Sequence, residues 1–269
     1  MVAKLPSLAA DAVLLDLEDG VAPAEKQAAR RNLDDARRDG LLDGRKPWCL
    51  RVNPPDSHWH DADLALASRL RPSVVVLPKA EEPERVRRLA RRCGPWGGRI
   101  GLMIETARGV AGVEALSRSH PAVELLIYGS ADYRRSIGAR PGGARDWESL
   151  AMQRILLAAR IGGCQAIDGV WFRYRDREGL RAEARIAREL GFDGKSCIHP
   201  EQVPPIHEVF SSTDEEIAWA RAVGKAWTEQ RGESSGVVVL DGEMIERLHL
   251  DIARRILDRA GGAATEDAS

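Results

Sequence analysis

Short aliphatic runs alternate with longer, charged amphipathic stretches over most of the chain, from about residue 12 to residue 210. An uninterrupted apolar run is typical of a strand buried on both faces, whereas apolar positions three and four residues apart are typical of a helix. The pattern predicts seven strands, at Ala12–Asp16, Trp48–Asn53, Ser73–Lys79, Arg99–Glu105, Val123–Ser130, Gln165–Val170 and Lys195–His199. It predicts helices between them, among these Ala24–Arg38, Pro83–Arg92, Gly109–Arg118, Trp147–Ile161 and Arg177–Leu190. Strands that alternate with helices form a parallel sheet, either covered on both faces or closed into a barrel.

The alternation ends after Phe210. Thr213–Gln230 predicts a capped helix, Arg231–Gly236 a flexible link, and Val237–Ala260 a short strand followed by a terminal helix. We therefore expect a (β/α) barrel domain over residues 1–210 and a C-terminal helical extension over residues 211–269, the latter without a core of its own. Gly138–Arg145 contains Pro and Gly and predicts a loop on the active face, a candidate lid.

Two of the predicted strands run into a carboxylate. The run that starts at Arg99 ends in Glu105, and the run that starts at Val123 continues to Asp132, with one helical stretch between them. A strand, a helix and a strand in this order form a parallel crossover, so both acids should emerge at the carboxyl ends of neighbouring strands. Mg²⁺ takes one or two protein carboxylates and keeps other positions for water and substrate. The pair therefore predicts a metal site, with a helix cap or a surface charge as the alternative for either acid.

Composition narrows the function classes. The 269 residues suffice for one large core, and the formal net charge of −1 favours neither a nucleic acid nor an anionic membrane as partner. The four Cys form no CxxC pair, which argues against a disulfide framework and a zinc site. We see no apolar run of about 18 residues and no signal pattern, and expect a cytoplasmic protein.

Seven phrases carry a family resemblance. They are Asp11–Val21 (DAVLLDLEDGV), Arg51–Asn53 (RVN), Leu77–Lys79 (LPK), Ile104–Thr106 (IET), Gly129–Asp132 (GSAD), Ala166–Val170 (AIDGV) and Gly191–Gln202 (GFDGKSCIHPEQ). In this order, they resemble the citrate lyase β-subunit and malyl-CoA lyase superfamily, the HpcH/HpaI aldolase/citrate lyase family. The resemblance implies a TIM-type (β/α)₈ barrel, assembled as a homotrimer or hexamer. It also implies Mg²⁺, with Mn²⁺ as an alternative, held by Glu105 and Asp132.

The resemblance also implies roles for individual residues. Arg51 would clamp the carboxylate of a 2-oxo acid through paired hydrogen bonds, and Glu18 and Asp19 would line the metal site or orient its neighbours. Lys79 and Glu105 would contribute to substrate binding. From the residues alone, the alternative for Arg51 is a surface arginine, which the apolar residues before it and Asn53 after it disfavour, and the alternative for the Glu18–Asp19 pair is a structural salt-bridge cluster. For two further residues, we favour a structural role at Asp168 and leave His199 open between lining the mouth and simple packing.

The chain departs from the family pattern in two places. The opening strand of the family is not found, so we expect a barrel without its first strand and with two unpaired edges, covered by an upstream segment, a neighbouring chain or the tail. The family's acid/base aspartate, often supplied by an adjacent subunit, corresponds to Glu246, whose side chain is one methylene longer. A general acid or base must reach the reacting atom, so this change bears on turnover and on substrate choice.

Three functional hypotheses follow. The first is a Mg²⁺-dependent carbon–carbon lyase that splits a short 3-hydroxyacyl-CoA such as citramalyl-, malyl- or citryl-CoA into an acyl-CoA and a 2-oxo acid, or forms it by Claisen condensation. The second is a pyruvate-type class II aldolase on the same barrel. The third is a catalytically silent subunit that binds a metal and an acyl-CoA thioester, against which the presence of Glu105, Asp132 and Arg51 argues.

Overall fold

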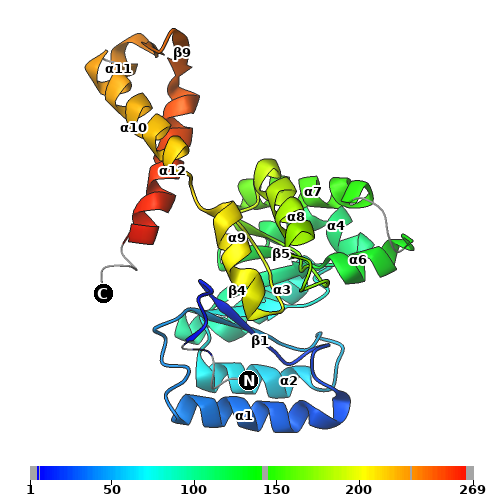
Figure 1. Cartoon of the computed structure of the whole chain (residues 1–269). Coiled ribbons are helices and arrows are strands. Elements are labelled where there is room, and N and C mark those ends of the chain that lie inside the picture. The colour runs from blue at the N-terminus through cyan, green and yellow to red at the C-terminus, as the bar shows by residue number, and fades with distance from the viewer. Residues whose placement is uncertain (1–4, 6, 141–144, 231, 265–269) are drawn as a thin grey trace. The chain divides into compact units, whose positions relative to one another are not determined.

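The computed structural model describes residue 5 and residues 7–140, 145–230 and 232–264 (Figure 1). The chain divides into two compact units, Met1–Ile206 and His207–Ser269, and each is considered by itself. Of the described helices, none combines the length and the hydropathy needed to cross a membrane.

The first unit is built on a parallel sheet in which each strand pairs with the next strand along the chain. Its strands are β1 (Val13–Asp16), β2 (Trp48–Arg51), β3 (Val74–Leu77), β4 (Arg99–Ile104), β5 (Val123–Tyr128), β6 (Gln165–Asp168) and β7 (Gly194–Lys195). The helices between them are η2 (Pro23–Glu25), α1 (Lys26–Arg38), α2 (His60–Leu70), α3 (Pro83–Cys93), η3 (Gly94–Trp96), α4 (Ala107–Ala111), α5 (Val113–Ser117), α6 (Ser130–Ile137), η4 (Arg145–Glu148), α7 (Ser149–Gly162) and α8 (Arg177–Leu190). After β7 come η5 (Pro200–Gln202) and α9 (Val203–Phe210), which runs into the second unit. Because all seven strands are parallel, their carboxyl ends meet at one edge of the sheet.

All seven predicted strands are present, and the order β1 to β7 is that of a TIM-type barrel. Within the described residues the sheet is not closed between β7 and β1, and Leu14 on β1 is 39% exposed. This is the unpaired edge expected of a barrel that lacks a strand. The predicted helix over 109–118 is in fact two, α4 and α5, because the chain leaves helical geometry at Gly112. Asp132, which we expected at the end of a strand, lies in the first turn of α6. Four residues of the predicted loop over 138–145 lie outside the described residues.

The core follows from the alternation of side chains along each strand. Residues on one face, such as Leu50, Leu102 and Leu126, are fully buried beneath the helices. The other face carries the smaller interior cluster of the barrel, formed by Cys49, Val74, Val76, Met103 and Ile127.

A buried ionic cluster joins the ends of β6 and β7. Asp168 is fully buried and accepts hydrogen bonds from Arg145 at 2.8 and 3.0 Å and from Lys195 at 2.6 Å. Lys195 also contacts Glu183 at 2.6 Å, and Arg145 contacts Glu148 at 2.7 Å. Burial alone would raise the pKa of Asp168, but Lys195 and Arg145 hold it below its usual value. These contacts give Asp168 the structural role that we favoured.

The second unit is more ordered than we expected. It contains α10 (Asp214–Glu229), α11 (Gly232–Ser235), the antiparallel hairpin of β8 (Val237–Leu240) and β9 (Glu243–Glu246), and α12 (Arg247–Ala264). Our expectation of an extension without a core was wrong, because eight of its residues form a buried apolar cluster: Ala220, Val223, Ala226, Trp227, Val238, Ile245, Leu250 and Ala253. The predicted flexible link is also wrong where the structure describes it, since α11 occupies 232–235.

The sequence predicts one strand in this region, but the chain turns back at Asp241 and Gly242 and forms a second strand, β9. Asp241 and Gly242 both have positive φ, 51° and 84°, as a two-residue turn with mirror-image geometry requires. Asp-Gly between apolar runs is a known signal of such a hairpin. By contrast, the predicted helix over 213–230 is present as α10, with Thr213 and Glu216 forming a capping box.

The ionic cluster generates a test of its role. Asp168→Ala would leave the buried cations Lys195 and Arg145 without their shared carboxylate. Removing one partner of a buried ion pair typically costs about 3–5 kcal/mol, so urea unfolding should show a loss of this order. Asp56→Ala is the control, because Asp56 also pairs with an arginine but its side chain is 78% exposed, and its unfolding midpoint should stay close to that of the wild type. Similar midpoints for both variants would contradict a stabilising role for Asp168.

Candidate active site

The carboxyl ends of β1 to β4 bring charged side chains together from distant parts of the sequence. Arg51 is the last residue of β2 and contacts Asp16 at the end of β1, with Nη2 and Oδ2 2.6 Å apart. Lys79 follows β3 and contacts both Glu18 and Asp19. Glu105 directly follows β4 and accepts a hydrogen bond of 2.8 Å from the backbone amide of Lys79.

The guanidinium of Arg51 is held mainly by Asp16. Its Nε donates to Oδ1 of Asp16 at 2.7 Å and its Nη2 to Oδ2 at 2.6 Å, which is the paired geometry of an arginine and a carboxylate. Burial would lower the pKa of Arg51, but Asp16 and Glu18 raise it above its usual value. The paired edge that we assigned to a substrate carboxylate is therefore occupied by a residue of the chain.

Asp16 also shapes the turn that carries the acidic pair. Its carboxylate accepts hydrogen bonds from the backbone amides of Glu18 at 2.8 Å and Gly20 at 2.9 Å. Burial acts to raise the pKa of Asp16, but the Arg51 guanidinium and these amides lower it. We did not single out Asp16 from the sequence, although the alternation of side chains places it on the same face as Glu18.

Glu18 is buried, with 2% exposure, and its two oxygens have different surroundings. Oε1 contacts Nζ of Lys79, whereas Oε2 lies 3.2 Å from Nη1 of Arg51 without the geometry of a hydrogen bond. Asp19 is 63% exposed and lies 3.0 Å from Nζ of Lys79. Lys79 itself has a φ of 48°, in the left-handed region that is uncommon for residues other than glycine. This backbone geometry lets its amide reach Glu105 while its side chain reaches Glu18.

Glu105 is as deeply buried as Glu18, with 2% exposure. Within the described residues it forms no ion pair. Burial raises its pKa to about 7, the charges of Glu18 and Asp132 add to the rise, and the amide and charge of Lys79 oppose it. A Cβ at Gly129 would lie 2.5 Å from Oε2 of Glu105, so the carboxylate lies against the glycine that precedes α6.

Asp132 joins the site from the first turn of α6. Its side chain is 23% exposed and contacts Arg135 at 2.5 Å, and its charge acts on Glu105. Asp132 and Glu105 therefore belong to the same end of the sheet, as the sequence predicted.

The donor set fits a divalent cation. Glu105 is a buried carboxylate whose charge lacks a cationic side-chain partner among the described residues, and Oε2 of Glu18 is buried without a hydrogen bond. In the described part of the chain, no group of three or more His, Cys, Asp or Glu is placed to hold a metal. Two carboxylates, with water and substrate completing the shell, are the arrangement that Mg²⁺ tolerates.

A buried lysine holds the backbone of the turn that carries Glu18 and Asp19. Lys26 is buried and its Nζ donates to the backbone oxygens of Leu17 at 2.6 Å and Glu18 at 2.7 Å, and to Oδ1 of Asn53 at 2.9 Å. No sequence pattern predicted this lysine in the interior, since Lys is rarely buried unless its charge is paired.

Two further residues from the sequence analysis, Glu246 and His199, lie on other elements of the chain. Glu246 ends β9 in the second unit, where its backbone amide donates to Nδ1 of His249 at 3.0 Å. His199 packs its ring against Tyr174, with centroids 4.8 Å apart, and its Nδ1 accepts from the amide of Glu201 at 3.2 Å. His199 thus matches the packing alternative.

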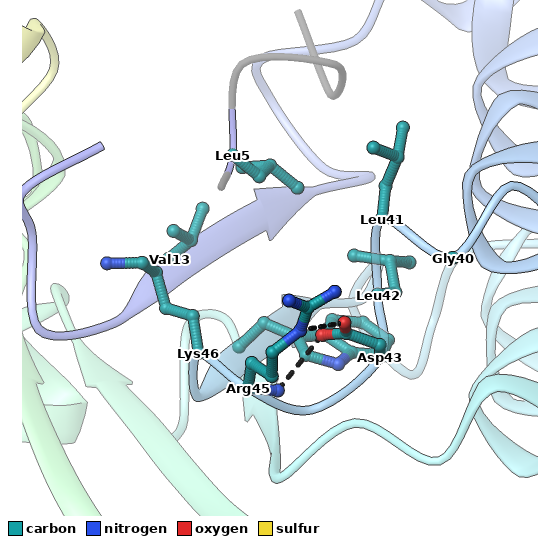
Figure 2. A pocket seen from close by; sticks show the side chains of 9 residues that line it. Leu5, Val13, Gly40, Leu41, Leu42, Asp43, Arg45 and Lys46 are labelled. Carbon is teal, nitrogen blue, oxygen red and sulfur yellow. Dashed lines mark hydrogen bonds and ion pairs between the residues drawn. The ribbon is translucent and has the colours of Figure 1, made fainter. Parts of the chain in front are cut away.

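A cavity of about 290 Å³ lies at the other end of the strands (Figure 2). It is lined by Val13 and Trp48, the first residues of β1 and β2. Its polar residues are already paired, since Arg45 contacts Asp43 and Lys46 donates to the backbone oxygens of Leu8 and Ala10. In barrels of this type the amino ends of the strands serve stability and the carboxyl ends carry the chemistry.

The burial of Glu105 predicts a pH dependence in protein treated with EDTA. Its pKa is about 7 in the fold against 4.5 in a model peptide, so between these values the folded state holds a proton that the unfolded state has lost. The free energy of unfolding should therefore fall as pH rises through this window and level off above pH 7. At 1.36 kcal/mol for each pKa unit, the contribution is of the order of 3 kcal/mol.

Glu105→Gln removes this titration and keeps an acceptor for the amide of Lys79. Above pH 7 it should stabilise the EDTA-treated protein relative to the wild type, with little difference near pH 5, as measured by urea unfolding. Glu124→Gln is the control, because the Glu124 side chain is 45% exposed, and it should follow the wild type. If the free energy of unfolding of Glu105→Gln depended on pH in the same way as that of the wild type, the proposed cost of burying the Glu105 charge would be refuted.

Comparison with known proteins agrees with the fold. A family model described as HpcH/HpaI aldolase/citrate lyase matches residues 1–200, and a second, described as a carbon–carbon bond lyase of the TIM-barrel fold, matches residues 146–262. The chain is 36% identical to a (3S)-malyl-CoA thioesterase of Cereibacter sphaeroides strain KD131, over 99% of this chain and 92% of the relative. It is 34% identical to the mitochondrial citramalyl-CoA lyase of Rattus norvegicus, over 96% of this chain and 82% of the relative.

The crystal structure of CitE from Mycobacterium tuberculosis, in complex with magnesium, acetoacetate and coenzyme A, has a TM-score of 0.80 to this structure. It is 34% identical, over 96% of this chain and 92% of that chain. The family resemblance and the barrel fold are thereby confirmed. With a family model that spans residues 1–200 and relatives that align along almost its whole length, the chain belongs to the HpcH/HpaI aldolase/citrate lyase family and is a carbon–carbon lyase.

Proposed function

We propose that the protein is a Mg²⁺-dependent lyase that cleaves a short 3-hydroxyacyl-CoA into an acyl-CoA and a 2-oxo acid, or forms it by Claisen condensation. The observation that carries the proposal is the buried Glu105 carboxylate, which lies beside Asp132 and within the field of Lys79 without an ion-pair partner among the described residues. The magnesium, acetoacetate and coenzyme A bound to the CitE relative support it, as does the name citramalyl-CoA lyase of another relative.

Glu105 and Asp132 would hold the cation, Mg²⁺ or alternatively Mn²⁺. When bound, such an ion supplies a Lewis acid that lowers the pKa of a substrate hydroxyl and stabilises a developing oxyanion. The residues of the chain provide the remaining functions of binding, orientation and proton transfer.

Arg51 would bind the carboxylate of the 2-oxo acid. Because Asp16 takes Nε and one hydrogen of Nη2, the hydrogens left for the substrate are those of Nη1 and the second hydrogen of Nη2. Asp16 thus fixes the plane of the guanidinium, and the substrate would complete its hydrogen bonds. Lys79 is anchored between Glu18 and Asp19 and would add positive charge on the substrate side.

Glu246 would exchange a proton with the carbon alpha to the thioester. In the hairpin register Val237 pairs with Glu246 and Val239 with Met244, while Val238 and Ile245 face the core of the second unit. Val237, Val239 and Met244 are 42%, 58% and 64% exposed. A carboxylate on an exposed apolar surface is typical of a face that docks on another surface. We propose that this face covers the mouth of a neighbouring subunit's barrel in a homotrimer or hexamer.

One relative suggests a second candidate. The (3S)-malyl-CoA thioesterase, which is 36% identical to this chain, is named for cleavage of the thioester and not of the carbon–carbon bond. The same charged mouth would then direct water at the thioester carbonyl.

The two reactions differ in their products. The purified protein is mixed with citramalyl-CoA, malyl-CoA or citryl-CoA, with Mg²⁺ or with EDTA, and the products are separated by liquid chromatography and mass spectrometry. A lyase gives acetyl-CoA together with pyruvate, glyoxylate or oxaloacetate, and it stops in EDTA. Free CoA together with the intact hydroxy acid would indicate the thioesterase instead, and no turnover of any of the three would refute both.

Glu246→Gln tests the acid/base. A general acid or base contributes about 10²–10⁴ in rate, so the variant should lose at least about 100-fold of the deuterium exchange into acetyl-CoA while still binding the 2-oxo acid. Glu243→Gln changes an exposed acid on the same hairpin and should exchange like the wild type. Equal rates for wild type and Glu246→Gln would show that Glu246 is a bystander.

Co-expression tests whether Glu246 acts on a neighbouring subunit. Glu105→Gln and Glu246→Gln should each be inactive alone. Mixed oligomers would regain activity if a barrel with intact Glu105 receives Glu246 from another chain. Mixed oligomers without activity would place both residues in the same chain's site.

A further inference from the structure

Met103 lies beneath the candidate site. It is on β4, two positions before Glu105, and side chains two positions apart on a strand share a face. Met103 is 7% exposed and belongs to the interior cluster of the barrel with Val76 and Ile127. The acidic mouth therefore has an apolar floor.

The sulfur of Met103 contacts the same guanidinium that we assign to the substrate carboxylate. Nη1 of Arg51 donates to Sδ of Met103 at 3.2 Å, and a thioether is a weak acceptor. The other group near Nη1, Oε2 of Glu18, lies 3.2 Å away without a hydrogen bond. Nη1 is thus the edge where Arg51 has its weakest partners, and a carboxylate that takes this edge would replace the sulfur and lie against Met103.

Around Met103, the inner face carries Arg51 and its ion-pair partner Asp16 on the side of β1 and β2, and isoleucines on the side of β5 and β6. Asp16, Arg51 and Lys79 lie at the ends of β1 to β3. From β4 onward the register aligns Met103 with Ile127, and Ile127 with Ile167. A substrate held by its carboxylate on the charged side would turn its remaining substituent toward this apolar strip.

We infer that Met103 is a specificity-determining residue, which sets the size of the group carried on the carbonyl carbon of the 2-oxo acid. The inference rests on the proposed function. The unbranched methionine side chain fills space between Arg51 and Ile127, so a shorter residue opens room for a larger substituent. One methylene in an apolar pocket changes selectivity by about 10- to 200-fold.

Binding of a graded series tests this without relying on turnover. Calorimetry measures the Kd of glyoxylate, pyruvate and 2-oxobutyrate in the presence of Mg²⁺ for the wild type, Met103→Ala and Met103→Val. The ratio of the Kd for glyoxylate to that for 2-oxobutyrate should rise about tenfold or more in Met103→Ala, and by less in Met103→Val. Met152→Ala is the matched control, because Met152 is a buried methionine on α7 and should leave the ratio unchanged.

The outcomes separate the two proposals. The same ratio in the wild type and in both Met103 variants overturns the role of Met103, as does failure of the wild type to bind any of the three acids. A shifted ratio supports it. If the ratio shifts while the wild type turns over none of the acyl-CoA substrates, the role of Met103 stands and the proposed lyase reaction falls.

Discussion

The burial of one carboxylate sets the conditions for the rest of this site. Glu105 ends β4 inside the barrel mouth, where it accepts a hydrogen bond from a backbone amide and has no ion-pair partner in the described part of the chain. Removing a charge from water without a partner is costly, and the rise of its pKa to about 7 reflects that cost. Buried groups with strongly perturbed pKa values cluster at functional sites, and on this basis we propose Glu105 as a ligand of the cation.

The neighbouring cationic side chains form their ion pairs with other acids and leave Glu105 without an ion pair among the described residues. Arg51 is held by Asp16, and Lys79 by Glu18 and Asp19. Each cation is thereby neutralised by acids other than Glu105. With its unusual backbone conformation, Lys79 donates its amide to Glu105 while its ammonium contacts Glu18 and Asp19. Such local strain persists where the surrounding contacts impose it, as it does at many active sites.

The names of the relatives indicate that one barrel fold can carry more than one reaction on an acyl-CoA. Two proteins of similar identity to this chain are named for different reactions on malyl-CoA or citramalyl-CoA. A barrel that positions a metal, a carboxylate clamp and an acyl thioester leaves open which bond breaks, and that choice depends on the groups that approach the thioester. Of the elements of this chain, we expect the hairpin with Glu246 to decide it, because function resides in the site and not in the fold.

The strands and the edge of the sheet that carries the candidate site could be predicted from the amino-acid sequence alone. Buried parallel strands are continuous apolar runs, so β1 to β7 were visible without the structure, and parallel order alone placed Glu105 and Asp132 at one edge. The core of the second unit and its hairpin were missed, although the Asp241-Gly242 turn was readable. The pairing of the charged residues could not be predicted in this way and is seen only in the folded chain. Asp16 and Arg51 are 35 positions apart, and Glu18 and Lys79 are 61 positions apart. Strand register brings these residues together, and no local pattern encodes it, because each pairing depends on the packing of the whole sheet.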